Sequence, residues 1–370
     1  MTRTPLGTRL PEFPWDTLSP AKKRAEAHPD GIVNLSVGTP VDPVAPGIQL
    51  ALAEAAPEPG YPETAGTPEL RSAIVEALER RYGMTGLSSA AVLPVIGTKE
   101  AIALLPSLLG IRDGFVVIPE VAYPTYEVAA LLGENRVLRA DSLVQIGPEN
   151  PDLLFLNSPS NPTGKVLGVD HLRKVVGWAR ERGVIVASDE CYLGLGWEDD
   201  NQPVSILDPR VCGGDHTGLI AIHSLSKTSN LASYRGGYLA GDPALIAELL
   251  EVRKHAGLMV PGPIQAAMLA ALRDDGQEQL QKLRYARRRA LLLRALIDAG
   301  FTVDDSEAGL YLWATRGEDC RATVDALAEL GILVASGDFY GPRGRQHVRV
   351  ALTGTDERVD AAVTRLATLG

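Results

Sequence analysis

Cysteines, aromatic residues and long apolar runs are scarce in this chain of 370 residues. Its three cysteines, Cys191, Cys212 and Cys320, are widely spaced and form neither a disulfide framework nor a zinc-binding pattern. No stretch approaches the about 18 uncharged apolar residues that span a bilayer, and the N-terminus lacks the apolar core of a signal peptide. We therefore predict a cytoplasmic protein with no membrane-spanning segment and no metal site.

Several widespread motifs are also missing. No GxGxxG follows a predicted strand, and GxxxxGK[ST], GxSxG and paired HxxxH histidines are absent, which disfavours a nicotinamide enzyme, a nucleotide hydrolase, a serine hydrolase and a zinc enzyme. The net charge of −10 argues against nucleic acid as the main partner. The one dense basic run, RYARRR at residues 284–289, lies in a predicted helix, and we interpret it as a solvated helix face.

The order of the predicted elements indicates two domains. Apolar runs at residues 115–118, 153–156, 184–188, 219–223 and 237–240 alternate with amphipathic segments at 68–82, 99–109, 123–132 and 169–182. This alternation is typical of a doubly wound α/β domain, which we place at residues 46–255. A long helical stretch at 263–299, followed by three short apolar alternations at 309–314, 332–336 and 347–351, predicts a smaller α+β domain. We expect the N-terminal 45 residues to pack on it or on a partner subunit.

A lysine follows one of the predicted buried strands directly. The strand at 219–223 continues into Ser224-Leu225-Ser226-Lys227, and α/β folds bind ligands at the carboxyl ends of their parallel strands. Loss of solvent there lowers the pKa of a lysine and makes its amine nucleophilic. Ser224, Ser226 and Arg235 could donate to a nearby anion. A surface lysine in a polar loop is the alternative that this motif alone leaves open.

Three further segments place polar groups at the same edge or at a helix start. Asn161 lies in the Pro-rich turn NSPSNPTG after the strand at 153–156, a turn that could contain a cis peptide bond. Asp189 follows the strand at 184–188, three residues before Tyr192, and could pair with a ring nitrogen. Gly97 and Thr98 open a helix whose free N–H groups could bind phosphate. Taken singly, each could equally be a turn, a surface acid or a helix cap.

Together these motifs resemble the class I/II aminotransferases. SNPTG, D-x-x-Y and SxSK with an arginine eight residues on occur in that family's order and spacing, and the resemblance runs from about residue 33 to the C-terminus. It implies the aspartate-aminotransferase-like fold type I, with a mostly parallel seven-stranded sheet between helices in a large domain (46–255). Residues 1–45 and 256–370 would form the small α+β domain. It also implies pyridoxal 5′-phosphate (PLP) as cofactor and a homodimer with shared active sites.

The resemblance assigns the cofactor contacts. Lys227 resembles the Schiff-base lysine and proton shuttle, and Asp189 the partner of the pyridine nitrogen. Asn161 and Tyr192 resemble the pair that binds the phenolic oxygen, while Tyr123 resembles the aromatic ring stacked on the cofactor. The residues that correspond to the phosphate-binding group are Thr98, Lys99, Ser224 and Arg235, with Tyr61 reaching the phosphate of the neighbouring subunit.

The resemblance also assigns the substrate contacts. Arg349 resembles the arginine that grips the substrate α-carboxylate, and Gly38 lies in the N-terminal loop beside it. Asn161 would border the same site. Lys99 stands where many relatives have a small or uncharged residue, so it could contact either the phosphate or a second anionic group of the substrate.

A finer resemblance concerns the substrate. The segments LPEFPWD (10–16), VIGTKEA (95–101), KHAGLMVPGP (254–263) and GDFYG (337–341) are similar to those of N-succinyldiaminopimelate aminotransferases of lysine biosynthesis. The implied reaction exchanges an amino group between glutamate and N-succinyl-2-amino-6-oxopimelate, in two half-reactions through pyridoxamine phosphate. Such a substrate carries several carboxylates, and the candidate cations for them are Lys99, Arg253, Lys254 and Arg343.

Other functions on this scaffold remain open. The chain could be an aminotransferase for aspartate, aromatic amino acids or LL-diaminopimelate, or a PLP-dependent β-lyase. A non-catalytic PLP-binding regulatory module is a third alternative. We do not expect it, because the resemblance to the catalytic fold begins close to residue 1, which leaves no room for a fused DNA-binding domain, and because Lys227 is present.

Overall fold

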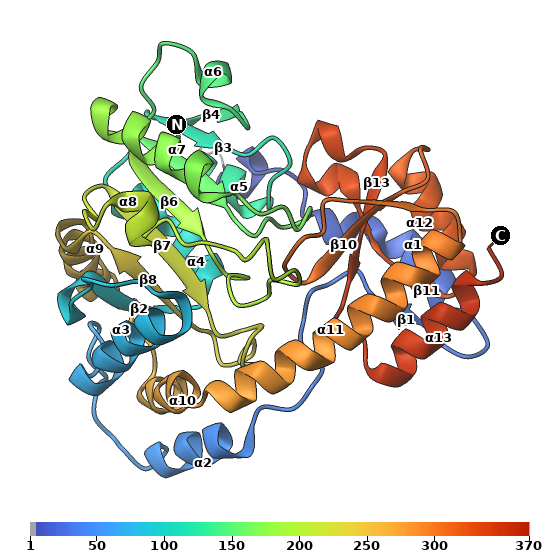
Figure 1. Ribbon diagram of the computed structural model, residues 1–370, viewed down its shortest axis with the longest axis horizontal. Coiled ribbons are helices and arrows are strands. Elements are labelled where there is room, and N and C mark those ends of the chain that lie inside the picture. Colours follow the sequence, from blue (N-terminus) through green and yellow to red (C-terminus); the bar gives the residue numbers. More distant parts are fainter. Residues whose placement is uncertain (1–4, 370) are drawn as a thin grey trace.

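A seven-stranded sheet forms the centre of the larger of two lobes in the computed structural model, which describes residues 5–369 (Figure 1). The strand order is β2-β8-β7-β6-β5-β3-β4; β8 runs antiparallel to both of its neighbours and the other pairs are parallel. The strands are β2 (Val92–Ile96), β3 (Phe115–Ile118), β4 (Arg136–Arg139), β5 (Leu153–Asn157), β6 (Ile185–Asp189), β7 (Leu219–Ser224) and β8 (Gly236–Gly241). The mostly parallel sheet expected from the sequence is therefore confirmed.

The sequence analysis found five of these strands and missed the two at the edges. β2 contains Pro94, which cannot donate to a neighbouring strand and reads as a strand breaker, but an edge strand tolerates it. β4 forms the other edge, and its sequence RVLR is only partly buried. β2 is apolar and almost wholly buried, so its proline alone hides it, whereas β4 lacks the continuous apolar character of the central strands.

Helices cover both faces of this sheet, and alternate residues of each strand point to opposite faces. Val116 packs against α4 (Thr98–Leu108), α5 (Thr125–Leu132) and α9 (Pro243–Ala256), whereas Val117 packs on the opposite face. The helices of that second face are α3 (Pro68–Tyr82), α7 (Val169–Arg182), α8 (Pro209–Cys212) and α10 (Gly262–Arg273), with α2 (Pro46–Ala55) packed against α10. A short helix, α6 (Leu143–Ile146), follows β4.

The predicted helix at 263–299 is two helices, α10 and α11 (Asp275–Asp298). They separate at Asp274, whose extended backbone stops α10 and whose carboxylate accepts a hydrogen bond from the Gln277 amide, an N-cap that starts α11. The core around the large sheet includes α10, so apolar packing crosses the predicted boundary at residues 255/256.

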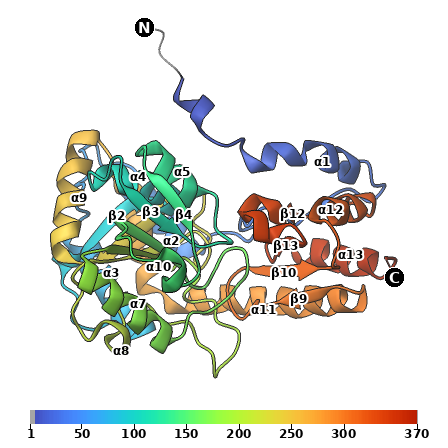
Figure 2. The ribbon, with the colours of Figure 1, turned by 90° about the horizontal axis from the view of Figure 1, so that it is seen from above.

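The small lobe has a core of its own. A four-stranded antiparallel sheet, β12-β13-β10-β9, lies beside a parallel pair of β1 and β11. Figure 2 shows α1 on the side of this lobe opposite to α11. The elements are α1 (Ser19–Glu26), β1 (Val33–Asn34), β9 (Thr302–Asp304), β10 (Tyr311–Thr315), α12 (Cys320–Glu329), β11 (Ile332–Leu333), β12 (Ala335–Ser336), β13 (His347–Ala351) and α13 (Asp356–Leu366). Because α1 packs on α12 and β1 pairs with β11, the N-terminal segment belongs to the small lobe, as the first of the two expectations had it.

None of the helices within residues 5–369 combines the length and the apolar character that crossing a membrane requires. The longest, α11, extends from the large lobe along the small one (Figures 1 and 2).

The basic run at residues 284–289 lies on α11, and its interpretation as a solvated face is wrong for Arg288. This guanidinium is buried and donates to both carboxylate oxygens of Asp42 at 2.7 Å and to Asp356 at 2.8 Å. Burial disfavours the charged form of Asp42, but hydrogen bonds from Arg288 and Gln281 hold the pKa of its carboxyl below its ordinary value. Arg288 thereby fixes the N-terminal loop that precedes α2 against α11 and α13.

We predict that Arg288→Met lowers the free energy of unfolding by about 3–5 kcal/mol, because it leaves the Asp42 carboxylate without its partner. The matched control is Arg294→Met on the same helix, whose exposed ion pair with Asp298 should contribute less than about 1 kcal/mol. Denaturant unfolding of both variants measures the difference. Equal losses would contradict a structural role for the buried pair.

Candidate active site

A cavity of about 610 Å³ lies where the carboxyl ends of β5, β6 and β7 face the small lobe. It brings together every predicted site residue except Tyr61. The predicted residues that line it are Gly38, Thr98, Lys99, Tyr123, Asn161, Asp189, Tyr192, Ser224, Lys227, Arg235 and Arg349. Parallel strands end at one edge of the sheet, and this geometry collects residues that are far apart in the sequence.

Lys227 reaches into the cavity from the loop after β7. Its ammonium donates a hydrogen bond to the Gly38 carbonyl oxygen, and Tyr285 donates to the Lys227 carbonyl oxygen at 3.2 Å, which fixes the backbone of the lysine. Burial lowers the pKa of Lys227 below its ordinary value. A lysine with a lowered pKa is the state that nucleophilic and proton-transfer chemistry require.

Asp189 ends β6 and is buried in the cavity wall. One carboxylate oxygen accepts from the Tyr126 hydroxyl at 2.7 Å, and the other accepts from the Cys191 amide at 3.2 Å. Burial raises the pKa of the Asp189 carboxyl although both hydrogen bonds act against that rise. A protonated ring nitrogen placed beside it would stabilise the charged carboxylate, so Asp189 fits a pyridine ring.

The loop after β5 holds Asn161 in place. The Asn157 side chain donates to the Pro159 and Asp189 carbonyl oxygens and accepts from the Asn161 amide at 2.7 Å. The Ser158–Pro159 and Asn161–Pro162 peptide bonds are both cis, as the sequence indicated for this turn. Asn161 in turn accepts a hydrogen bond from Arg349 across the cavity at 2.9 Å.

Arg349 is a buried cation without a carboxylate partner. It lies on β13 and donates to Asn161 and to the Ser36 carbonyl oxygen at 2.7 Å, while its Nε has no hydrogen-bond partner among the described residues. Its guanidinium carbon lies 3.9 Å from the ring centroid of Tyr311 and 5.3 Å from that of Tyr340. A free donor in a buried aromatic enclosure is a site for an anion such as a carboxylate.

The opposite end of the cavity forms an anion cradle. α4 begins at Thr98, so its first N–H groups are free for an acceptor, and Lys99 and Arg235 lie beside it. A Cβ atom on Gly97 would lie 2.2 Å from Arg235 Nη2, so only glycine lets the guanidinium come this close. Burial and the charge of Arg235 both lower the pKa of Lys99. A phosphate group here would relieve that repulsion.

Two tyrosines that the sequence analysis did not single out belong to the site: Tyr311 lines the cavity, and Tyr126 contacts the lining residues Tyr123 and Asp189. The Tyr311 and Tyr192 hydroxyls are 3.1 Å apart, and a Cβ atom on Gly38 would lie 2.1 Å from the Tyr311 hydroxyl. Tyr123 packs edge-on against Tyr126 at 5.8 Å between ring centroids. Tyr311 lies in the predicted apolar run 309–314, and a hydroxyl group in a run expected to be buried was a signal that could have identified it as a site residue. Trp15, which also lines the cavity, and Tyr126 gave no such signal, because tertiary packing determines their positions.

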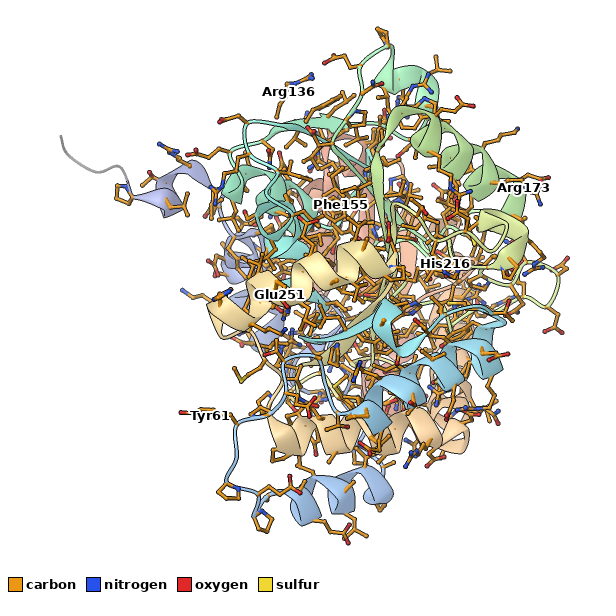
Figure 3. All side chains as sticks on the ribbon, turned by 90° about the vertical axis from the view of Figure 1, so that its left-hand side faces the viewer. Tyr61, Arg136, Phe155, Arg173, His216 and Glu251 are labelled. Atoms are coloured by element: carbon orange, nitrogen blue, oxygen red, sulfur yellow. The ribbon has the colours of Figure 1, made fainter. Side chains whose placement is uncertain are left out.

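Tyr61 and three of the four candidate cations lie elsewhere. Tyr61 is 98% exposed and projects from the loop between α2 and α3, as Figure 3 shows. Arg253 is buried in an ion pair with Glu100 at 3.0 Å, and Lys254 pairs with Glu251 at 2.6 Å on the same helix. Arg343 pairs with Glu120. Arg253, Lys254 and Arg343 do not line the cavity, so of the four cations only Lys99 is placed to contact a ligand there.

Comparison with a family model and with known proteins identifies the family of this chain. Residues 30–366 match the model of aminotransferase class I and II, so the chain belongs to this family. A Mycobacterium tuberculosis protein named a probable aminotransferase is 70% identical over 96% of this chain and 85% of its own length. The transaminase OxyQ of Streptomyces rimosus, named for 4-dedimethylamino-4-oxo-anhydrotetracycline, is 56% identical over 96% of this chain and 99% of its own.

A solved structure shares the fold along nearly its whole length. It is a Thermus thermophilus protein described as a probable N-succinyldiaminopimelate aminotransferase, with a TM-score of 0.86 and 27% identity over 97% of this chain and all of that one. Aminotransferases of this family use PLP, and the residues described above fit it. The anion cradle suits the phosphate, the Asp189 carboxylate suits the ring nitrogen, and Lys227 supplies the amine.

A second buried pair lies just beyond the cavity wall. His223 is stacked between Tyr82 and Tyr238, and its Nε2 is 3.4 Å from a carboxylate oxygen of Glu190, the neighbour of Asp189. Burial lowers the pKa of His223 to about 3 and raises the pKa of Glu190 to about 7. His223 is therefore uncharged at neutral pH and the contact is no ion pair. Both shifts limit the charge that surrounds Asp189.

We predict that Glu190→Gln gains stability relative to the wild type as the pH rises from 4.5 to 7. Between these values the unfolded glutamate loses its proton and the folded one keeps it, so the wild type loses stability, by up to about 3 kcal/mol. Glutamine has no proton to lose. Thermal unfolding across this pH range measures the difference between variant and wild type.

The control is Glu198→Gln, an exposed glutamate that should show no such trend. A difference between Glu190→Gln and the wild type that stays constant over the pH range would mean that Glu190 keeps an ordinary pKa.

Proposed function

We propose that this aminotransferase exchanges an amino group between glutamate and N-succinyl-2-amino-6-oxopimelate. The observation that carries the proposal is Lys99, an exposed cation at the cavity edge that forms no ion pair within residues 5–369. A substrate with carboxylates beyond its reacting end needs such a cation in addition to Arg349. The similarity to the Thermus thermophilus protein and the sequence segments around residues 10–16 and 337–341 support the same substrate.

The proposed roles follow from the geometry. When bound, PLP supplies an electron sink for negative charge at the substrate α-carbon. Lys227 would hold the cofactor and then carry the proton at that carbon, which its lowered pKa permits. Asp189 would keep the ring nitrogen protonated, Asn161 and Tyr192 would bind the phenolic oxygen, and Tyr123 would cover the ring. Arg349 would orient the α-carboxylate with its free Nε donor.

A second candidate acceptor is a polycyclic ketone, because OxyQ is 56% identical over nearly its full length. Arg349 favours the oxo acid. Glutamate and an oxo-acid acceptor both present an α-carboxylate to it, whereas a ketone without one would leave its buried Nε unpaired in the second half-reaction, and an unpaired buried donor is costly.

The test is an acceptor panel with the PLP-loaded enzyme and glutamate, in which 2-oxoglutarate formation is measured. The kcat/KM for N-succinyl-2-amino-6-oxopimelate should be about 100-fold or more above those for oxaloacetate and phenylpyruvate. The shorter acids would leave the protein groups that bind the distal polar atoms of the long acceptor unpaired. Preference for a polycyclic ketone, or for a reaction that releases pyruvate from a β-substituted amino acid, would overturn the proposal.

The subunit arrangement is proposed as a homodimer in which Tyr61 completes the partner's phosphate site. Tyr61 is almost fully exposed, although a tyrosine ring usually finds partners for its apolar surface. In a single chain it contributes nothing to the cavity. A second copy would give this residue a binding partner and the phosphate a further hydroxyl donor.

Mixing Tyr61→Ala with Lys227→Ala under subunit exchange should restore activity, because each hybrid dimer contains one complete site. At equal mixing about half of the dimers are hybrids, so about a quarter of all sites are complete. The assay is turnover before and after exchange. As the control, the doubly substituted Tyr61→Ala/Lys227→Ala protein mixed with wild type should lower activity, since each hybrid site then lacks one of the two residues. No recovery despite demonstrated exchange would place the whole site in one chain.

A further inference from the structure

A second cavity of about 750 Å³ adjoins the active-site cavity. The two share Phe13, Trp15, Lys99 and Tyr123, so they meet at these four side chains. The second cavity extends from there under the N-terminal segment 10–15, past the start of α5, to the short 3-10 turns after β12. It is larger than the active-site cavity, and no role described so far uses it.

The N-terminal segment forms the roof over the junction of the two cavities. Phe13 and Trp15 lie 5.6 Å apart between ring centroids, Trp15 lies 5.5 Å from Phe339, and Trp15 donates to the Ser36 carbonyl oxygen at 3.4 Å. Lys99 lies 5.3 Å from the Phe13 ring centroid. Phe13 remains 51% exposed. A ligand that passes from one cavity to the other would contact this exposed ring and the Lys99 ammonium together.

Among the charged residues that line the second cavity, two cations and one carboxylate, Glu12 in the N-terminal segment, form no ion pair within residues 5–369. Arg139 is paired with Glu127 at 2.7 Å, and Arg321 with Asp338 at 2.8 Å. Lys99 and Arg345 form no ion pair with any residue from 5 to 369, although both line this cavity. Lys99 belongs to both cavities and Arg345 only to the second. The backbone of Arg345 is fixed, since its carbonyl oxygen accepts from the Cys320 amide at 2.8 Å.

We propose that the second cavity binds the N-succinyl tail of the acceptor, with Lys99 at the carboxylate next to the amide and Arg345 at the terminal succinyl carboxylate. This inference rests on the proposed function. An acceptor whose reacting carbon lies near Lys227 has its second carboxylate and its acyl group several bonds away, which directs them toward the junction at Lys99 and the second cavity. The apolar wall suits the methylene groups, and the two free cations suit the two distal carboxylates.

The test compares two acceptors, N-succinyl- and N-acetyl-2-amino-6-oxopimelate, with glutamate as donor; the acetyl compound lacks the terminal carboxylate and one methylene group of the tail. The wild type should prefer the succinyl compound in kcat/KM by about 10- to 100-fold, as expected for a hydrogen bond to a charged group. Arg345→Ala should reduce this preference to within about 3-fold while retaining turnover of the N-acetyl compound, which shows that the variant is folded and loaded with cofactor.

Arg343→Ala is the matched control. Arg343 is exposed, two residues away, paired with Glu120, and lines neither cavity, so the preference should stay at the wild-type value. If Arg345→Ala keeps the full preference, or the wild type has none while turning over both compounds, the tail site is refuted and the proposed function stands. If the wild type turns over neither compound, the proposed function fails, and the tail site fails with it.

Discussion

The buried guanidinium of Arg349 is the contact on which the arrangement of the site depends. Its backbone lies in β13 at the centre of the small sheet, and its donors reach Asn161 of the large lobe and Ser36 of the N-terminal segment. One side chain thus links the large lobe to the small lobe and to the N-terminal segment that packs on the small lobe. A buried charge is tolerated only if its hydrogen-bond donors have acceptors. Because the Nε of Arg349 has no acceptor among the described residues, its hydrogen bonding would be completed by a bound anion.

The charge distribution of the site is opposite to that of the whole protein. The net charge is −10, yet the active-site cavity is lined by Lys99, Lys227, Arg235 and Arg349 against a single carboxylate, Asp189. A phosphate and an α-carboxylate would neutralise most of this excess. Until they bind, repulsion between Lys99 and Arg235 adds to burial in lowering the pKa of Lys99. Burial, and to a smaller extent the charges of Arg349 and Arg235, lower the pKa of the Lys227 amine, so the cations that attract the anions also favour the neutral amine.

Part of the site could be predicted because its residues follow buried strands or begin a helix, whereas Tyr123, Lys99, Gly38 and Arg349 were assigned only by the resemblance to the family. Asp189, Ser224 and Lys227 were found from apolar runs whose ends must meet at one sheet edge. Tyr311 and Trp15 could not be placed, since they reach the cavity through packing of the small lobe and the N-terminal segment. The prediction that Arg288 is solvent-exposed was wrong for a related reason. A helical pattern does not reveal that Asp42 and Asp356, which are distant in the sequence, both accept hydrogen bonds from this side chain. The edge strands β2 and β4 were missed because proline and partial exposure hide their character.

A transaminase that acts on two different substrates has to bind both of them at one site. The two adjoining cavities bear on this constraint. In the proposed reaction, glutamate and the acceptor would both place an α-carboxylate at Arg349, so discrimination between them would have to arise beyond that point. If the cation for the distal carboxylate of the acceptor lay within the first cavity alone, the side-chain carboxylate of glutamate could also bind it. Such a cation would not distinguish the two substrates. Lys99 lies at the junction of the two cavities, whereas Arg345 belongs only to the second. A proposed tail site separated in this way would add affinity for the long acceptor without weakening the binding of glutamate, because the additional binding energy comes from groups that one substrate has and the other lacks.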